Sequence, residues 1–72
     1  MYKEILPIKL KQARKEAGIK QEEVADIINI SRATISKYEN GQLEPNIETL
    51  GMLADFYEVS ADWLIGTKGG KK

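Results

Sequence analysis

Cysteine and histidine are both absent from the 72 residues of this chain. Without cysteine no disulfide can form, and without either residue a zinc site loses its two best ligands. The same absences exclude the Ser-His and Cys-His pairs that activate nucleophiles in many enzymes. The sequence also shows no convergent acidic cluster and no phosphate-binding loop. We therefore expect no enzymatic activity, no cofactor and no metal site.

Long apolar runs are missing too, so we expect no segment that spans a membrane. Residues 1–7 lack the apolar core and the cleavage site of a signal peptide, which predicts a cytoplasmic protein. Apolar residues make up 42% of the chain and charged residues 31%, which is typical of a folded globular domain. A chain of this length forms one domain, expected over residues 1–66, with a flexible tail at 67–72.

The chain carries no net charge, unlike most nucleic-acid-binding domains. Its charges are nevertheless unevenly distributed: residues 1–20 balance to +4 (six basic, two acidic), residues 21–46 to −3 (two basic, five acidic) and residues 47–72 to −1 (three basic, four acidic). A neutral protein can still present one positive face to phosphate groups. Because ordinary solvated helix faces give similar runs, the charge pattern alone leaves both interpretations open.

Apolar residues recur with helical period along the chain, and no stretch alternates as a strand would. The first predicted helix has Pro7 in its first turn and ends at Gly18. Its inner face is an apolar stripe: Leu6, Leu10, Ala13 and Ala17.

A second helix is predicted over 21–28, and a third follows an N-cap at Ser31 and extends to Asn40. Lys20 stands where a capping hydroxyl would stabilise the second helix by about 0.5–2 kcal/mol, and two glutamates in the first turn compensate. Asn29 tolerates the left-handed conformation that the connecting turn needs. The inner residues of the two helices are expected to be Val24, Ala25, Ile28, Ile35 and Tyr38.

Asn46 is predicted to cap a fourth helix, and Ser60 a fifth that ends at Gly66. Gly51 lies inside the fourth helix, at a cost of about 1 kcal/mol relative to alanine. The apolar residues of these helices are Ile47, Leu50, Leu53, Ala54, Tyr57, Trp63 and Leu64. The chain is therefore predicted to be all-α, with five short helices joined by tight turns.

The second and third helices, joined by residues 29–31, form a candidate helix-turn-helix across 21–40. The third helix has few inner residues, so the rest of its surface is free to enter a DNA groove about 12 Å wide. That surface combines small residues with two long cations: Arg32, Ala33, Thr34, Ser36 and Lys37. Spacing alone fits a DNA-binding unit and an ordinary helical hairpin equally well.

Four segments carry a likeness to a known family: LKQARKEAG at 10–18, QEEVA at 21–25, ISKYENG at 35–41 and residues 53–66. Through them the stretch Lys9–Gly66 resembles a Cro/CI-type (XRE family) helix-turn-helix domain. The resemblance implies a compact five-helix, lambda-repressor-like fold whose third helix recognises DNA.

The resemblance also implies roles for single residues. Arg32 and Ala33 match the family's foremost base-contacting positions, which implies a bidentate bond to guanine and a contact with a thymine methyl group. Ser36 and Lys37 match base-contacting positions one turn further along, and Lys37 is expected to meet guanine or phosphate. Thr34 is expected to contact the DNA backbone.

Further backbone contacts are implied around the same unit. Gln21 matches the glutamine that opens the first helix of the motif, where it bonds a phosphate and braces the recognition helix. Asn40, with the backbone N–H groups around Gly41 and Gln42, resembles the family's phosphate-binding turn. Lys20, in place of the usual capping hydroxyl, adds a further cation for phosphate.

Arg14 and Glu39 match a pair that the family often uses as an ion pair beneath the DNA-binding surface. The alternative is two unrelated surface charges, and an exposed pair contributes less than about 1 kcal/mol. Lys9 and Lys11 are additional cations whose orientation toward DNA the sequence leaves open.

One recognition helix contacts only a few base pairs, so we expect a homodimer on inverted half-sites about 34–36 Å apart. The candidate dimer interface is Met52, Trp63 and Ile65, with Trp63 favoured as a core residue. The expected function is sequence-specific regulation of transcription, most simply repression, with a double-stranded DNA operator as partner. The alternative, favoured by the zero net charge, is a helix-turn-helix scaffold for protein–protein contacts, such as an antitoxin-like or regulatory partner.

Overall fold

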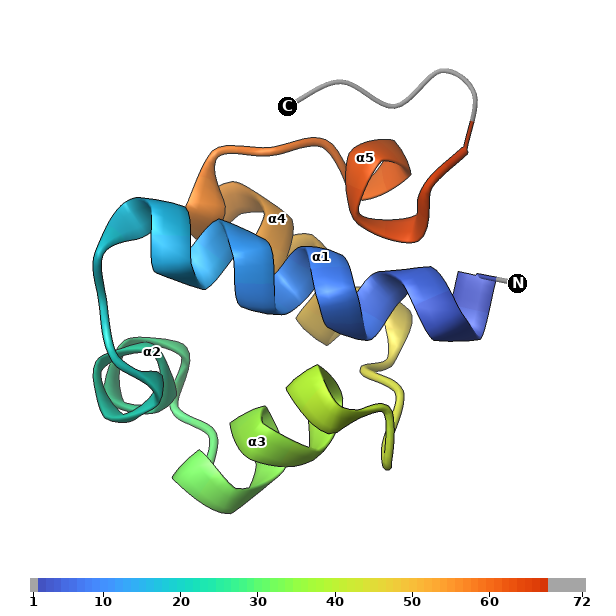
Figure 1. The fold of residues 1–72 in the computed structure, drawn as a ribbon. Helices are drawn as coiled ribbons and strands as arrows, with labels where there is room; N and C mark the ends of the chain where they lie inside the picture. Colours follow the sequence, from blue (N-terminus) through green and yellow to red (C-terminus); the bar gives the residue numbers. More distant parts are fainter. Residues whose placement is uncertain (1, 68–72) are drawn as a thin grey trace.

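The computed structural model describes residues 2–67, with side chains from Glu4 onward. This part of the chain contains no strand and five helices: α1 (Tyr2–Ala17), α2 (Gln21–Ile28), α3 (Arg32–Asn40), α4 (Ile47–Tyr57) and α5 (Ala61–Ile65) (Figure 1). The prediction of an all-α chain with five helices is confirmed. The predicted flexible tail lies, apart from Thr67, outside the described residues.

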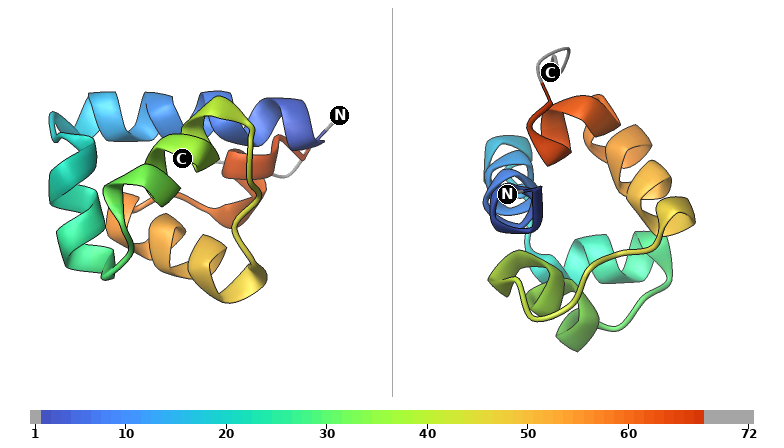
Figure 2. Two further views of the ribbon diagram at one scale, coloured as in Figure 1. Left: turned by 90° about the horizontal axis from the view of Figure 1, so that it is seen from below. Right: turned by 90° about the vertical axis from the view of Figure 1, so that its right-hand side faces the viewer.

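The helices surround one core. Viewed along α1, that helix lies on one side of the molecule and α4 on the other, with α5 above them and the α2–α3 pair below (Figure 2). α1 packs against α3 and α5, and α2 packs against α3. None of the helices in residues 2–67 is long and apolar enough to cross a lipid bilayer.

Polar side chains cap three of the helices as the sequence predicts. Each accepts a backbone N–H three residues ahead: Ser31 Oγ from Thr34 at 3.1 Å, Asn46 Oδ1 from Thr49 at 2.8 Å and Ser60 Oγ from Trp63 at 3.0 Å. Lysine has no acceptor atom, so the side chain of Lys20 cannot cap α2. The capping hydrogen bond at the start of α2 instead runs from the backbone to a side chain. The carboxylate of Glu23 accepts the backbone N–H of Lys20 at 3.0 Å.

Left-handed residues follow all five helices, and Gly18 after α1 has φ 72°. Asn29 has φ 64°, as expected, and Gly41 and Gly66 follow α3 and α5 with φ 78° and 80°. α4 ends at Glu58 with φ 58°, which the sequence did not indicate because glutamate rarely adopts this conformation. The N–H of Glu58 donates to the carbonyls of Ala54 and Asp55, which pairs the last groups of the helix.

The start of α1 differs from the prediction. Pro7 was expected in the first turn, but α1 begins at Tyr2 and Pro7 lies inside it, where it removes one bond from the helix ladder. Packing gives the reason for the extension: Leu6 is buried, and Ile5 lies against Gly66, where a Cβ would come within 2.8 Å of Ile5 Cγ2. Pro7 itself packs on the turn after α3, with its Cγ 3.4 Å from the Cβ position of Gly41.

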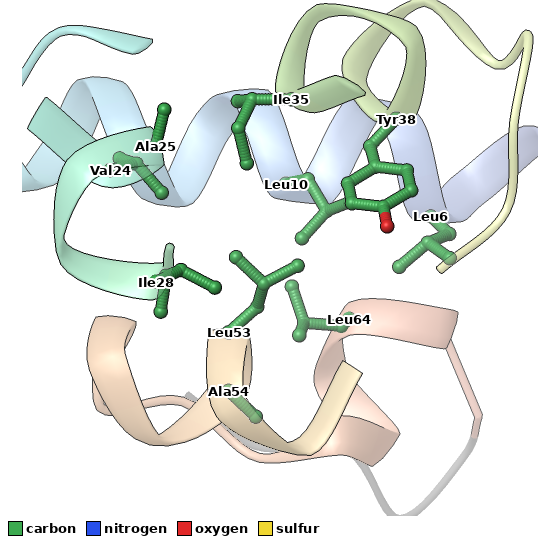
Figure 3. Packing of buried hydrophobic residues seen from close by; sticks show 10 residues of the cluster. All are labelled: Leu6, Leu10, Val24, Ala25, Ile28, Ile35, Tyr38, Leu53, Ala54 and Leu64. Atoms are coloured by element: carbon green, nitrogen blue, oxygen red, sulfur yellow. The ribbon is translucent and has the colours of Figure 1, made fainter. Parts of the chain in front are cut away.

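Apolar residues from all five helices meet in the centre (Figure 3): Leu6, Leu10, Val24, Ala25, Ile28, Ile35, Tyr38, Leu53, Ala54 and Leu64. Leu50, Tyr57 and Trp63 pack against this cluster while partly exposed. Of the residues assigned to apolar stripes, Ala13 is buried, and two others are exposed. Ala17, the last residue of α1, is exposed, and Ile47, the first residue of α4, is 89% exposed. Both occupy helix ends that extend past the edge of the core.

Candidate nucleic-acid interface

The outer side of α3 is free of other described elements. Only Ile35, Tyr38 and Glu39 of this helix are buried, and they face α1 and α2. Arg32, Ala33 and Lys37 are exposed. Because α3 forms the lower edge of the molecule, opposite α5, its exposed residues can approach a groove without obstruction from the rest of the chain (Figure 2).

The hydroxyl groups of α3 are held by neighbouring side chains. Thr34 Oγ1 lies 2.8 Å from Ser31 Oγ, and Asn40 Nδ2 donates to Ser36 Oγ at 3.3 Å. Thr34 and Ser36 are half-buried, whereas Asn40 is exposed. The predicted contact residues therefore fall into two groups. Arg32, Ala33 and Lys37 are exposed, and the hydroxyl residues Thr34 and Ser36 are half-buried and hydrogen-bonded to neighbouring side chains.

Arg14 and Glu39 form a bidentate ion pair beneath α3. Arg14 Nε donates to Glu39 Oε2 at 2.8 Å and Nη2 to Oε1 at 3.1 Å, and the two side chains are only 13% and 3% exposed. Nη1 donates to the carbonyl of Ile19 at 3.0 Å, a contact that the sequence did not predict. A carboxylate this deeply buried is tolerated only when paired, so Arg14 is a requirement of the site.

Two titrating groups at this site, Arg14 and Tyr57, have raised pKa values. The hydrogen bond from Arg14 to Glu39 raises the pKa of the guanidinium further above its ordinary value. Burial raises the pKa of Tyr57 to about 12, and the negative charge of Glu39 adds to the effect. Tyr57, near the end of α4, therefore lies within the field of the same pair.

Gln21, at the start of α2, joins this network. Its Nε2 donates to Glu39 Oε1 at 3.2 Å, and the side chain is half-buried. A side-chain amide nitrogen carries two hydrogens, so one remains for a ligand outside the protein. Glu39 thus connects α1, α2 and α3 through three hydrogen bonds.

Backbone N–H groups in the turn after α3 are already paired. Those of Gly41, Gln42 and Leu43 all point to the carbonyl of Lys37, with the second at 2.9 Å and the third at 3.3 Å. The C-terminal cap of α3 engages these amides, and their contact with phosphate stays a prediction. The exposed side chains of Asn40 and Gln42 remain for such a contact.

The structure shows on which side of the molecule each lysine lies whose orientation toward DNA the sequence did not decide. Lys9 Nζ lies 4.5 Å from the centre of the Trp63 ring, on the α5 side of α1. Lys11 lines a shallow hollow together with Glu39, on the α3 side. Lys20, just before α2, is exposed beside Gln21.

The three residues named as a dimer interface do not share one environment. Trp63 and Ile65 are partly buried and pack against the core, in agreement with a core role for Trp63. Met52 is 42% exposed on the outer side of α4.

The arrangement is that of a helix-turn-helix domain, and a helix-turn-helix family model of the Cro/CI (XRE) type matches residues 10–64. The chain belongs to this family, whose members are regulators and generally not enzymes.

Several curated regulators are similar to this chain, among them the following three. It is 41% identical over 58 residues to the HTH-type transcriptional regulator ImmR of Bacillus subtilis, which covers 81% of this chain and 46% of that protein. It is 41% identical over 51 residues to the cryptic phage CTXphi transcriptional repressor RstR of Vibrio cholerae, covering 71% and 46%. With the HTH-type transcriptional activator BcrR of Enterococcus faecalis it shares 39% identity over 57 residues, covering 79% and 28%. The chain spans about half the length, or less, of these relatives.

Proposed function

We propose that this chain is the DNA-binding domain of a transcriptional regulator, and that α3 enters the major groove of a double-stranded DNA operator. The observation that carries the proposal is the exposure of Arg32 and Lys37 on a helix whose inner side is anchored by the buried Glu39. Anchoring matters because base recognition needs a helix held in one orientation relative to the phosphates. The names of similar regulators and of a phage repressor support the same function.

Within this function, Arg32, Ala33, Ser36 and Lys37 contact base edges. Arg32, at the first position of α3, has the reach for a bidentate bond to guanine, and Ala33 suits a thymine methyl group. Phosphates are contacted by a second set of residues on both sides of α3: Lys20, Gln21, Thr34, Asn40 and Gln42.

The domain acts as a homodimer on inverted half-sites, with the half-exposed Trp63 and Ile65 of α5 as the proposed contact. Occupation of an operator blocks polymerase, so repression is the simplest outcome. Because similar proteins include both a repressor and an activator, a reporter gene placed behind the selected operator tests the direction.

The experiment is selection of bound sequences from a random DNA pool, followed by affinity measurements on the selected operator. Arg32→Ala is expected to cost about 1–3 kcal/mol and to relax preference at one base position. Lys15→Ala is the matched control, because it removes one exposed cation from α1 rather than from α3. Equal losses for both variants would contradict base recognition by Arg32.

A scaffold for protein–protein contacts is the competing function, and the zero net charge of the chain favours it. Titration with salt separates the two. Binding to DNA must weaken steeply as salt rises, because each neutralised phosphate releases counterions. Selection that recovers no preferred sequence, together with salt-independent binding, would favour the scaffold.

A further inference from the structure

Charge is segregated between the two sides of this molecule. The sequence contains no lysine or arginine between Lys37 and Lys68, and that stretch holds six carboxylates: Glu39, Glu44, Glu48, Asp55, Glu58 and Asp62. α1 contains five cations, of which Arg14 and Lys9 are engaged with Glu39 and Trp63. Lys11 and Lys15 remain exposed.

The two charged helices lie on opposite sides of the core. α1 and α4 face each other across the interior, and their outer surfaces point in opposite directions (Figure 2). The outer side of α3 points in a third direction, downward in the same view. The hollow on α1 borders α3, since Glu39 lines it together with Lys11 and Lys15, whereas Arg32 and Lys37 are not among its residues.

The α4 face, defined as Ile47, Glu48, Gly51, Met52 and Asp55, is apolar and acidic. Ile47 is 89% and Met52 42% exposed, and all five residues are open to solvent. Gly51 weakens the helix, and no atom of the chain outside its own helix backbone lies within 4 Å of its Cβ position. Nothing within the described chain covers this face or requires the glycine, whereas a neighbouring helix could approach closely there.

The α1 face, defined as Ile8, Lys11 and Lys15, is apolar and basic. Ile8 is 66% exposed, and the three residues line one shallow hollow along the helix, together with Gln12, Glu16 and the buried Glu39 of α3. Ile8 and Lys15 are two helical turns apart, as are Glu48 and Asp55, so the two faces have matching lengths. Glu4 and Glu16, near the ends of the α1 face, both interact within the chain.

We propose that the α4 face of one copy docks on the α1 face of a second copy of this chain. Ile8 on one side and Ile47 and Met52 on the other would be covered, and Lys11 and Lys15 would meet Glu48 and Asp55. Contact between two α4 faces is disfavoured because the charged residues of each face are all carboxylates. Like charges brought together in an interface cost several kcal/mol. Two α1 faces are disfavoured for the same reason.

The contact is head-to-tail, so each copy keeps one free α1 face and one free α4 face, and the assembly is open. Zero net charge removes the overall repulsion that keeps many proteins monomeric. A patch of this size makes a weak interface, which serves to link neighbouring copies at high local concentration. The proposal does not depend on DNA binding.

Sedimentation equilibrium of the whole chain without DNA tests the proposal. At low salt and concentrations up to about 1 mM, the average mass is expected to rise above that of the monomer and to fall back as salt is added. Lys11→Glu with Lys15→Glu, and separately Glu48→Lys with Asp55→Lys, should each weaken association at least about tenfold. All four substitutions in one chain should restore it, because the charges are exchanged.

Mixing the two double variants provides the decisive control. Each has two faces of one sign, so each alone should be monomeric, while the mixture should associate. Circular dichroism checks that all variants fold. A wild-type chain that stays monomeric overturns the proposal, and so does an assembly that the Lys11 and Lys15 changes leave intact. The latter would indicate an α4–α4 contact or the proposed α5 dimer.

Discussion

The side-chain nitrogen of Gln21 lies 3.2 Å from Oε1 of Glu39, the oxygen that also accepts Nη2 of Arg14 at 3.1 Å. This shared oxygen joins the first residue of α2 to the last turn of α3, so the two helices of the motif are locked together by a buried charge. The same bond fixes the orientation of the Gln21 amide. Its second hydrogen is thereby held ready for a phosphate, which gives Glu39 an indirect part in DNA binding.

Replacement of Gln21 by alanine should weaken binding to all DNA sequences alike. The lost contact is to a phosphate, which carries no sequence information, and we expect a cost of about 1 kcal/mol. Fluorescence anisotropy on the selected operator and on a scrambled duplex measures both affinities. Gln12→Ala removes the same group from the outer side of α1, where it bonds to Glu16, and should change neither. A shift in sequence preference for Gln21→Ala would argue against its backbone role.

Loss of the Glu39 charge should destabilise the fold. Glu39→Gln leaves Arg14 without its anionic partner in a site where the arginine is only 13% exposed, and we expect a loss of about 2–3 kcal/mol of unfolding free energy. Glu44→Gln is the isosteric control at an exposed loop position and should change stability by less than about 0.5 kcal/mol. Urea denaturation measures both. A loss for Glu39→Gln as small as that of the control would mean that solvent screens the pair.

Alkaline pH should destabilise the protein through Tyr57. Its pKa is raised from 10.0 to about 12 in the folded state, mainly by burial, so the folded chain keeps a proton that the unfolded chain releases. Its stabilising contribution is therefore complete below pH 10 and is lost as the pH rises to about 12. Denaturation midpoints of the wild type and of Tyr57→Phe over this range isolate the effect, which phenylalanine removes. Parallel pH profiles for the two proteins would contradict it.

Glycine in place of Glu58 should stabilise the protein. Glu58 adopts φ 58° at the end of α4, a conformation that costs an L-residue about 1 kcal/mol and glycine almost nothing. We expect a gain of about 0.5–1 kcal/mol in thermal or urea unfolding. Glu48→Gly, an exposed position inside the same helix, should instead lose about 1 kcal/mol. If both changes destabilise, the side chain of Glu58 contributes more than its backbone conformation costs.

Much of the fold was predictable because its signals are local. The caps at Ser31, Asn46 and Ser60 and the left-handed Asn29 depend on residues within a few positions of one another. Glu58 escaped prediction because glutamate rarely adopts the left-handed conformation that it has at the end of α4. The early start of α1 depends on distant partners of Ile5 and Pro7 in α5 and in the turn after α3.

The candidate site divides in the same way. The positions of Arg32, Ala33 and Lys37 on one helix follow from helical spacing, and the partnership of Arg14 with Glu39 followed only from the family resemblance. The bond from Gln21 to Glu39 that completes the network and the contact of Lys9 with the Trp63 ring had no local signal.

Amino-acid order alone determined the five helices of residues 2–67 and most of their caps, because helix periodicity and capping act over a few residues. Tertiary structure alone decided which charges are buried together, which cations are free and which apolar side chains are left on the outside. Those outcomes depend on contacts between segments far apart in the chain, and the burial that sets their energies exists only once the helices have packed.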